Sequence, residues 1–133
     1  MRRLSLLLVL STLALAQGLP LLLLDQPVQG AWEPGDQLAL DGSYLDSYVF
    51  QGTSSQQLSL ELRATVPGLL LVTDLEHKEL GRDGDGLETI SQVILTLLTD
   101  GLYLVTVNAF SPGQGGSYTL TLTTPPPLSS PGP

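Results

Sequence analysis

The sequence predicts an all-β protein, an antiparallel β-sandwich or barrel of about seven to eight short strands. Two observations predict this class. Between residues 30 and 123, apolar residues repeatedly alternate with polar ones, and turn signals rich in glycine, proline or aspartate separate the alternating runs. A period of two gives each strand one face to bury, and no segment after residue 30 carries a helical apolar stripe of useful length.

Three runs show the alternation most clearly, over residues 58–65, 102–109 and 118–123. Every second side chain in a strand points to the same face, so the apolar members of these runs should form the core. They are Leu58, Leu60, Leu62, Ala64, Tyr103, Val105, Val107, Ala109, Tyr118, Leu120 and Leu122.

Three further strands are expected over residues 47–52, 69–73 and 92–98. The run 69–73 is apolar throughout, which is typical of a strand buried on both faces. Turn signals separate the strands at residues 67–68, 81–86, 100–101 and 111–116.

The first residues predict export. Arg2 and Arg3 form a cationic start, residues 4–15 are almost wholly apolar, and residues 14–16 (Ala-Leu-Ala) match a signal peptidase site. These parts together define a secretory signal peptide over residues 1–16. We therefore expect a secreted or periplasmic protein.

An uncleaved membrane anchor is the alternative, because the apolar character resumes at residues 21–24. Gln17, Gly18 and Pro20 interrupt it, which favours cleavage after residue 16. The remaining chain divides into three parts: a lead-in segment over 17–29, one β-sandwich over 30–123 and a proline-rich tail over 124–133, which we expect to be disordered.

Charge limits the partners. The chain has 13 acidic and 5 basic residues, and cleavage removes Arg2 and Arg3, so the mature net charge is 3 − 13 = −10. Such a surface repels phosphate backbones, which excludes nucleic acid and an anionic membrane surface as partners. The chain has no cysteine, so its stability must come from packing or from a bound cation rather than from disulfides.

Seven short motifs follow one another in a recognisable order. They are G-D-x-L at 35–38, D-G-S-x-x-D-x-Y-x-F-x-G at 41–52, L-S-L-E-L at 58–62, L-L-L-V-T-D at 69–74, D-G-D-G at 83–86, L-L-x-D-G-x-Y-x-V-x-V at 97–107 and G-S-Y-x-L-x-L at 116–122. Each motif alone is weak, but the ordered set resembles the bacterial pre-peptidase C-terminal domain family over about residues 30–123.

This resemblance implies a jelly-roll-like β-sandwich of the kind attached to secreted hydrolases, peptidases above all. Members of the family include modules that bind collagen or other insoluble polymers, and some bind calcium. We therefore expect an exported, non-catalytic binding or interaction module that recognises an envelope or extracellular polymer or an exported enzyme. The alternatives are a calcium-stabilised structural or folding-assistance domain for a secreted peptidase, and a carboxylate-dependent hydrolase.

Catalytic residues are scarce. His77 is the single histidine and lies among charged residues that indicate an exposed turn. Nucleophilic catalysis needs a base that a third group orients, and zinc sites of the usual composition need several cysteine or histidine ligands. The sequence therefore favours a protein that is not an enzyme.

Calcium is the one cofactor for which the sequence offers candidate ligands. Asp41 and Asp46 lie in one glycine-containing acidic loop, and Asp83 and Asp85 lie in another. Calcium prefers carboxylate and carbonyl oxygens on such loops. The alternative is that these aspartates accept hydrogen bonds from nearby backbone N–H groups and only shape the turns.

Two aromatic residues are candidates for ligand binding. Trp32 and Tyr44 lie outside the regular alternation, near the N-terminal edge of the predicted sandwich. Modules that bind polymers use exposed aromatic platforms, so these are the first residues to consider. The alternative for Trp32 is packing over the end of the sandwich.

Overall fold

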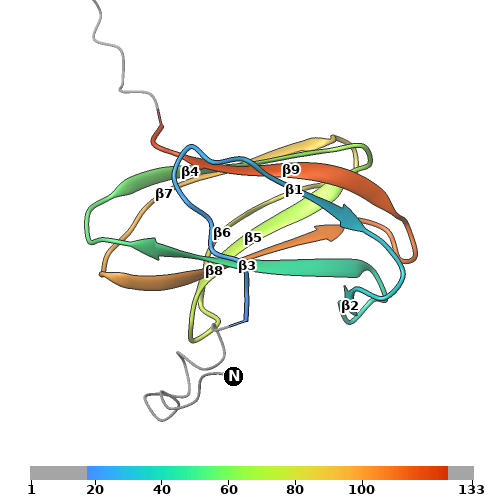
Figure 1. The fold of residues 1–133 in the computed structure, drawn as a ribbon, viewed down its shortest axis with the longest axis horizontal. Helices are drawn as coiled ribbons and strands as arrows, with labels where there is room; N and C mark the ends of the chain where they lie inside the picture. Colours follow the sequence, from blue (N-terminus) through green and yellow to red (C-terminus); the bar gives the residue numbers. More distant parts are fainter. Residues whose placement is uncertain (1–17, 126–133) are drawn as a thin grey trace, which may run out of the picture.

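The structure is a computed structural model that describes residues 18–125. The predicted signal peptide and most of the proline-rich tail lie outside the described residues. Within them the chain forms nine β-strands and no helix (Figure 1). The strands are β1 (Val28–Trp32), β2 (Gln37–Leu38), β3 (Tyr44–Gly52), β4 (Gln57–Ala64), β5 (Gly68–Asp74), β6 (Glu79–Asp83), β7 (Ile90–Thr96), β8 (Gly101–Ala109) and β9 (Gly116–Thr123).

The strands form two antiparallel sheets that pack face to face as two layers (Figure 1). The smaller sheet has the order β1-β9-β4-β7, and the larger sheet has the order β2-β3-β8-β5-β6. Consecutive strands stay in one sheet only in the pairs β2-β3 and β5-β6, and every other connection between the described strands crosses between the layers. The predicted all-β, jelly-roll-like sandwich is confirmed.

The core lies between the layers and is built from the alternating residues. Of the predicted core side chains, all but Ala64 are buried, and Ala64 packs against their cluster. The strands β4, β8 and β9 therefore follow the predicted period of two. The apolar run in β5 differs from the expectation, because Leu70 and Val72 are buried whereas Leu69 and Leu71 are half-buried.

Two parts of the sandwich are larger than the sequence indicates. β6 was not predicted, and its residues 81–83 fall in a segment that we predicted as a turn, because an edge strand with charged side chains and a glycine carries little apolar signal. The N-terminal part of the sandwich begins before residue 30: β1 starts at Val28, and the Leu22 side chain is buried. The Leu22 N–H also donates to the Val49 carbonyl at 2.8 Å, so the lead-in segment pairs with β3.

The described part of the chain contains no helix long and apolar enough to cross a membrane.

Core packing makes a direct prediction about stability. Leu60 and Val105 are fully buried, one in each sheet. Replacing either by alanine removes apolar contacts and leaves a cavity, so we expect a loss of about 2–4 kcal/mol in the free energy of unfolding. Leu40 is fully exposed, and Leu40→Ala is the matched control, for which we expect a change below about 0.5 kcal/mol. Urea denaturation measures all three, and near-zero losses at both core positions would contradict the assigned core.

Candidate functional site

The outer face of the smaller sheet carries neutral polar side chains across three paired strands. In β9 the residues Ser117, Thr119, Thr121 and Thr123 alternate with buried ones and therefore point away from the core. The register sets Thr121 beside Glu61 of β4. The same register continues into β7, so one row runs across the face from β9 to β7. The outward positions of β4 and β7 are Gln57, Ser59, Glu61, Arg63, Ile90, Gln92, Ile94 and Thr96.

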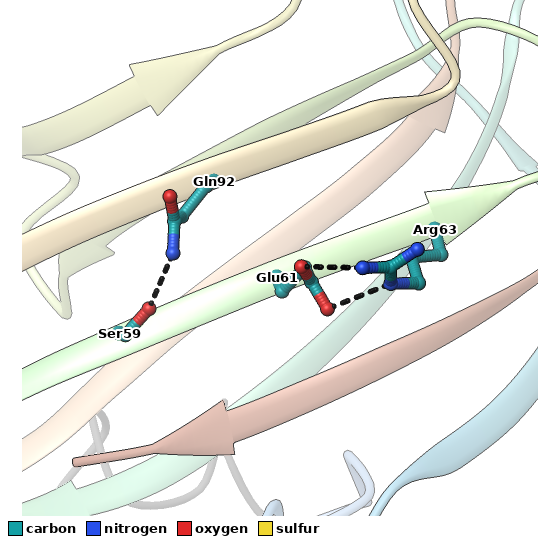
Figure 2. A network of polar contacts seen from close by, with 4 residues as sticks. All are labelled: Ser59, Glu61, Arg63 and Gln92. Carbon is teal, nitrogen blue, oxygen red and sulfur yellow. Dashed lines mark hydrogen bonds and ion pairs between the residues drawn. The ribbon is translucent and has the colours of Figure 1, made fainter. Parts of the chain in front are cut away.

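Polar contacts tie this face together (Figure 2). The Gln92 side-chain amide donates to the Ser59 hydroxyl across β7 and β4 at 3.1 Å. Beside it, the Arg63 Nε donates to Glu61 Oε1 at 2.9 Å within β4. An exposed pair of this kind adds little stability. Its effect is electrostatic. The opposite charges of Glu61 and Arg63 cancel, so the outer face formed by β9, β4 and β7 has no net charge.

The two aspartates of the first predicted calcium loop are already engaged as hydrogen-bond acceptors. Asp41 Oδ1 accepts from the backbone N–H and the hydroxyl of Ser43, at 2.9 and 2.7 Å. These bonds lower the pKa of Asp41 below its ordinary value, because they favour the ionised carboxylate. Asp46 Oδ2 accepts instead from the Tyr118 hydroxyl at 2.6 Å.

The second predicted loop is similar. Asp83 Oδ2 accepts from the Gln92 backbone N–H at 2.8 Å, and Asp85 Oδ1 accepts from the Leu87 backbone N–H at 2.9 Å. No group of three histidine, cysteine or acidic side chains within residues 18–125 is placed to hold a metal ion. The four predicted carboxylates therefore do not fit a shared calcium site, and calcium binding stays a prediction of the sequence alone.

Trp32 is not an exposed platform, so its assignment to ligand binding is wrong. Its side chain is 2% exposed, and its ring lies 4.8 Å from that of Tyr118. The indole N–H donates to the Val107 carbonyl of the opposite sheet at 3.2 Å. The apolar ring is buried in the core, and its polar N–H has a hydrogen-bond acceptor. Trp32 therefore packs inside the sandwich, which was the alternative considered for this residue. Tyr44 is half-buried at the start of β3 and packs against the core cluster.

A buried polar chain that the sequence did not predict joins the two sheets. The Tyr118 hydroxyl of β9 donates to Asp46, and it accepts from the Tyr48 hydroxyl of β3 at 2.6 Å. Burial raises the pKa of the Asp46 carboxyl, and the nearby Asp36 carboxylate adds to the shift. Burial likewise raises the pKa values of both tyrosines, so the phenols stay protonated.

Gly30 makes room for the Tyr118 side chain in this hydrogen-bonded network. It pairs with Tyr118 in the β1–β9 ladder, and a Cβ at Gly30 would lie 2.5 Å from the phenol oxygen of Tyr118. Any larger residue at this position would displace the ring. The sequence signal for the network is weak, because Tyr118 and Asp46 lie 72 residues apart.

His77 lies in the exposed turn between β5 and β6, as predicted, with a positive φ of 68°.

Comparisons with known proteins bear on the fold. No family model matches the sequence, and no curated protein matches it. The fold is similar to the pre-peptidase C-terminal domain of a collagenase from Bacillus anthracis, with a TM-score of 0.59 and 13% identity, covering 77% of this chain and 92% of that one. A further match is PliG from Salmonella Typhimurium, a periplasmic inhibitor of g-type lysozyme, with a TM-score of 0.42 and 13% identity over 77% of this chain and 96% of that one.

The first of these likenesses confirms the predicted resemblance at the level of the fold. The chain is a β-sandwich of the kind found in pre-peptidase C-terminal domains.

The half-buried carboxyl of Asp46 predicts a specific dependence of stability on pH. Its folded pKa lies above the ordinary 3.8, so the native state binds the proton more tightly than the unfolded chain does. The resulting penalty is absent below about pH 4 and grows as the pH rises through the folded pKa. As the pH rises from about 4 through the folded pKa, we expect the stability of Asp46→Asn to improve progressively relative to the wild type.

Asp41→Asn is the matched control, because the pKa of Asp41 is lowered rather than raised. That variant should lose stability relative to the wild type at neutral pH, and the loss should disappear as the pH falls through the folded pKa. Urea denaturation across the pH series measures both. The same slope for the two variants, or a constant offset for Asp46→Asn, would contradict the assigned environments.

Proposed function

We propose that the mature chain is an exported, non-catalytic binding module. Its ligand would be a neutral polymer, rich in hydroxyl or amide groups, of the cell envelope or the extracellular space. The polymer would lie on the outer face of the smaller sheet, across β9, β4 and β7.

The observation that carries this proposal is the neutrality of the face in a strongly acidic chain. The whole chain has a net charge of −8, yet the outward positions of these three strands hold one acidic and one basic residue, and these form an ion pair. The remaining polar positions are hydroxyl and amide side chains, which both donate and accept hydrogen bonds. A neutral ligand with the same groups matches this face better than a cationic one.

The spacing of the side chains suits a repeating ligand. Outward residues two apart in a strand are about 7 Å apart, and neighbouring strands are about 4.8 Å apart. Thr119, Thr121 and Thr123 therefore form a regular row, with the outward side chains of β4 beside it. A flat, periodic array of this kind favours an extended polymer over a small molecule, which prefers an enclosed pocket.

Export is supported by the predicted signal peptide. The cationic Arg2 and Arg3, the apolar run that follows and the cleavage motif at residues 14–16 together specify secretion. An exported chain is in direct contact with the polymers of the cell envelope and the extracellular space.

A pull-down on insoluble polymers tests the proposal. Peptidoglycan sacculi, chitin and cellulose present hydroxyl and amide groups, and we expect the exported protein to be retained on at least one of them. The triple variant Thr119→Ala, Thr121→Ala, Thr123→Ala removes three hydrogen-bonding groups worth about 1 kcal/mol each, so its affinity should fall roughly tenfold or more.

The matched control is Thr106→Ala, because Thr106 lies on the outer face of the larger sheet. It should bind as the wild type does. Beads coated with polylysine serve as a charge control. Retention on polylysine alone, no retention on any polymer, or equal binding by the triple variant would contradict the proposal.

A further inference from the structure

The open edges of β6 and β7 face each other at one side of the sandwich, and they are close together at one end only. There a Cβ added at Gly81 of β6 would lie 2.7 Å from the Val93 side chain of β7. Asp83 of β6 also accepts the outward-pointing backbone N–H of Gln92 at 2.8 Å. Toward the other end the edges diverge around a groove of about 410 Å³, whose lining includes Asp74, Lys78, Glu79, Leu80, Leu95 and Tyr103.

The backbone of β7 presents hydrogen-bonding groups to this groove. Odd-numbered residues of the strand pair with β4, as shown by the Leu97 N–H, which donates to the Gln56 carbonyl at 2.9 Å. Backbone groups in an antiparallel strand alternate between its two sides. The N–H and C=O groups of Ile94 and Thr96 therefore point away from β4, toward the open side.

The side chains around this edge are apolar on both faces of the sheet. On the inner side the groove is lined by Leu80, Leu95 and Tyr103. On the outer side Ile94 is 60% exposed. Leu98, which follows the strand and also lines the groove, is 82% exposed. Native proteins usually protect edge strands with charged residues, proline or bulges. β7 (Ile90–Thr96) contains neither charged residues nor proline, and β6 protects it only at Gln92.

The charges near the groove indicate which residues should flank the segment of a partner that binds there. The turn and strand beside it carry three carboxylates, Asp74, Glu76 and Glu79, against the two cations Lys78 and Arg82, and Arg82 is already paired with Glu79. The whole chain has a net charge of −8. A segment with basic residues at its ends is therefore attracted, and an acidic one is repelled.

We propose that the open end of β7 binds an extended, apolar polypeptide segment with basic flanking residues, which adds as a further strand to the smaller sheet. Its backbone pairs with Ile94 and Thr96. Its side chains point alternately toward the groove and toward Ile94 on the outer face, as in other cases of strand addition. This site uses the open edge of β7, whereas the polymer would lie on the face of the sheet; Ile94 and Thr96 belong to both surfaces, but the proposal does not rest on polymer binding.

A synthetic peptide of alternating valine and isoleucine, with two lysines at each end, tests the proposal on the full chain. We expect it to bind and to slow amide hydrogen exchange at Ile94 and Thr96. The same peptide N-methylated at every residue has no backbone N–H groups to donate from either edge, so its affinity should fall roughly tenfold or more. Equal binding of the two peptides, or no binding of the first, overturns the proposal.

Variants locate the site. Ile94→Lys introduces a charge on the edge strand and should weaken peptide binding roughly tenfold or more, whereas Leu40→Lys, at a fully exposed position elsewhere, should not. If circular dichroism shows that Ile94→Lys does not fold, the test rests on the wild type. Protection of the Ile94 and Thr96 amides by the peptide then decides whether the peptide binds at this edge. Self-association of the wild type that protects the same two amides without peptide would assign the edge to a second copy and overturn the proposal. Exchange protection confined to other strands would do the same.

Discussion

The packing of Trp32 and Tyr118 between the two sheets is the contact on which the rest of the structure depends. Both side chains belong to the smaller sheet, and each reaches the larger one through a hydrogen bond, to the Val107 carbonyl and to the Tyr48 hydroxyl. Their rings lie 4.8 Å apart, and Gly30 leaves the space that the Tyr118 ring needs. These contacts fix how the layers stack, and therefore which side chains remain on the outer faces.

In this arrangement, the residues that stabilise the fold differ from those of the proposed binding surface. The inward residues of β4, β8 and β9 hold the sheets together, and the aspartates of both predicted calcium loops accept hydrogen bonds that shape turns, cap an edge or join the network. The outer face of the smaller sheet contributes little to the core. Its threonines and amides therefore form the surface on which we propose that the polymer binds, in a chain whose core contains no disulfide.

The sequence predicted the core well because the core follows a local rule. Leu60 and Val105 sit at alternating positions, and their burial follows from periodicity alone. Trp32 was misplaced because its partner, Val107, lies 75 residues away. The hydrogen bond from Tyr118 to Asp46 could not be predicted for the same kind of reason, since nothing near Asp46 in the sequence reveals Tyr118. The candidate face depends on the register between β9, β4 and β7, which only the folded chain defines.

Nuclear magnetic resonance mapping can show whether the polymer binds the outer face of the smaller sheet. A soluble oligosaccharide cut from the polymer that retains the protein would be titrated into the isotope-labelled chain. We expect the largest chemical-shift changes on the outward residues of β9 and β4, with Thr121 and Gln57 among them. Changes centred on the outer face of the larger sheet, around Thr106, would contradict this proposal.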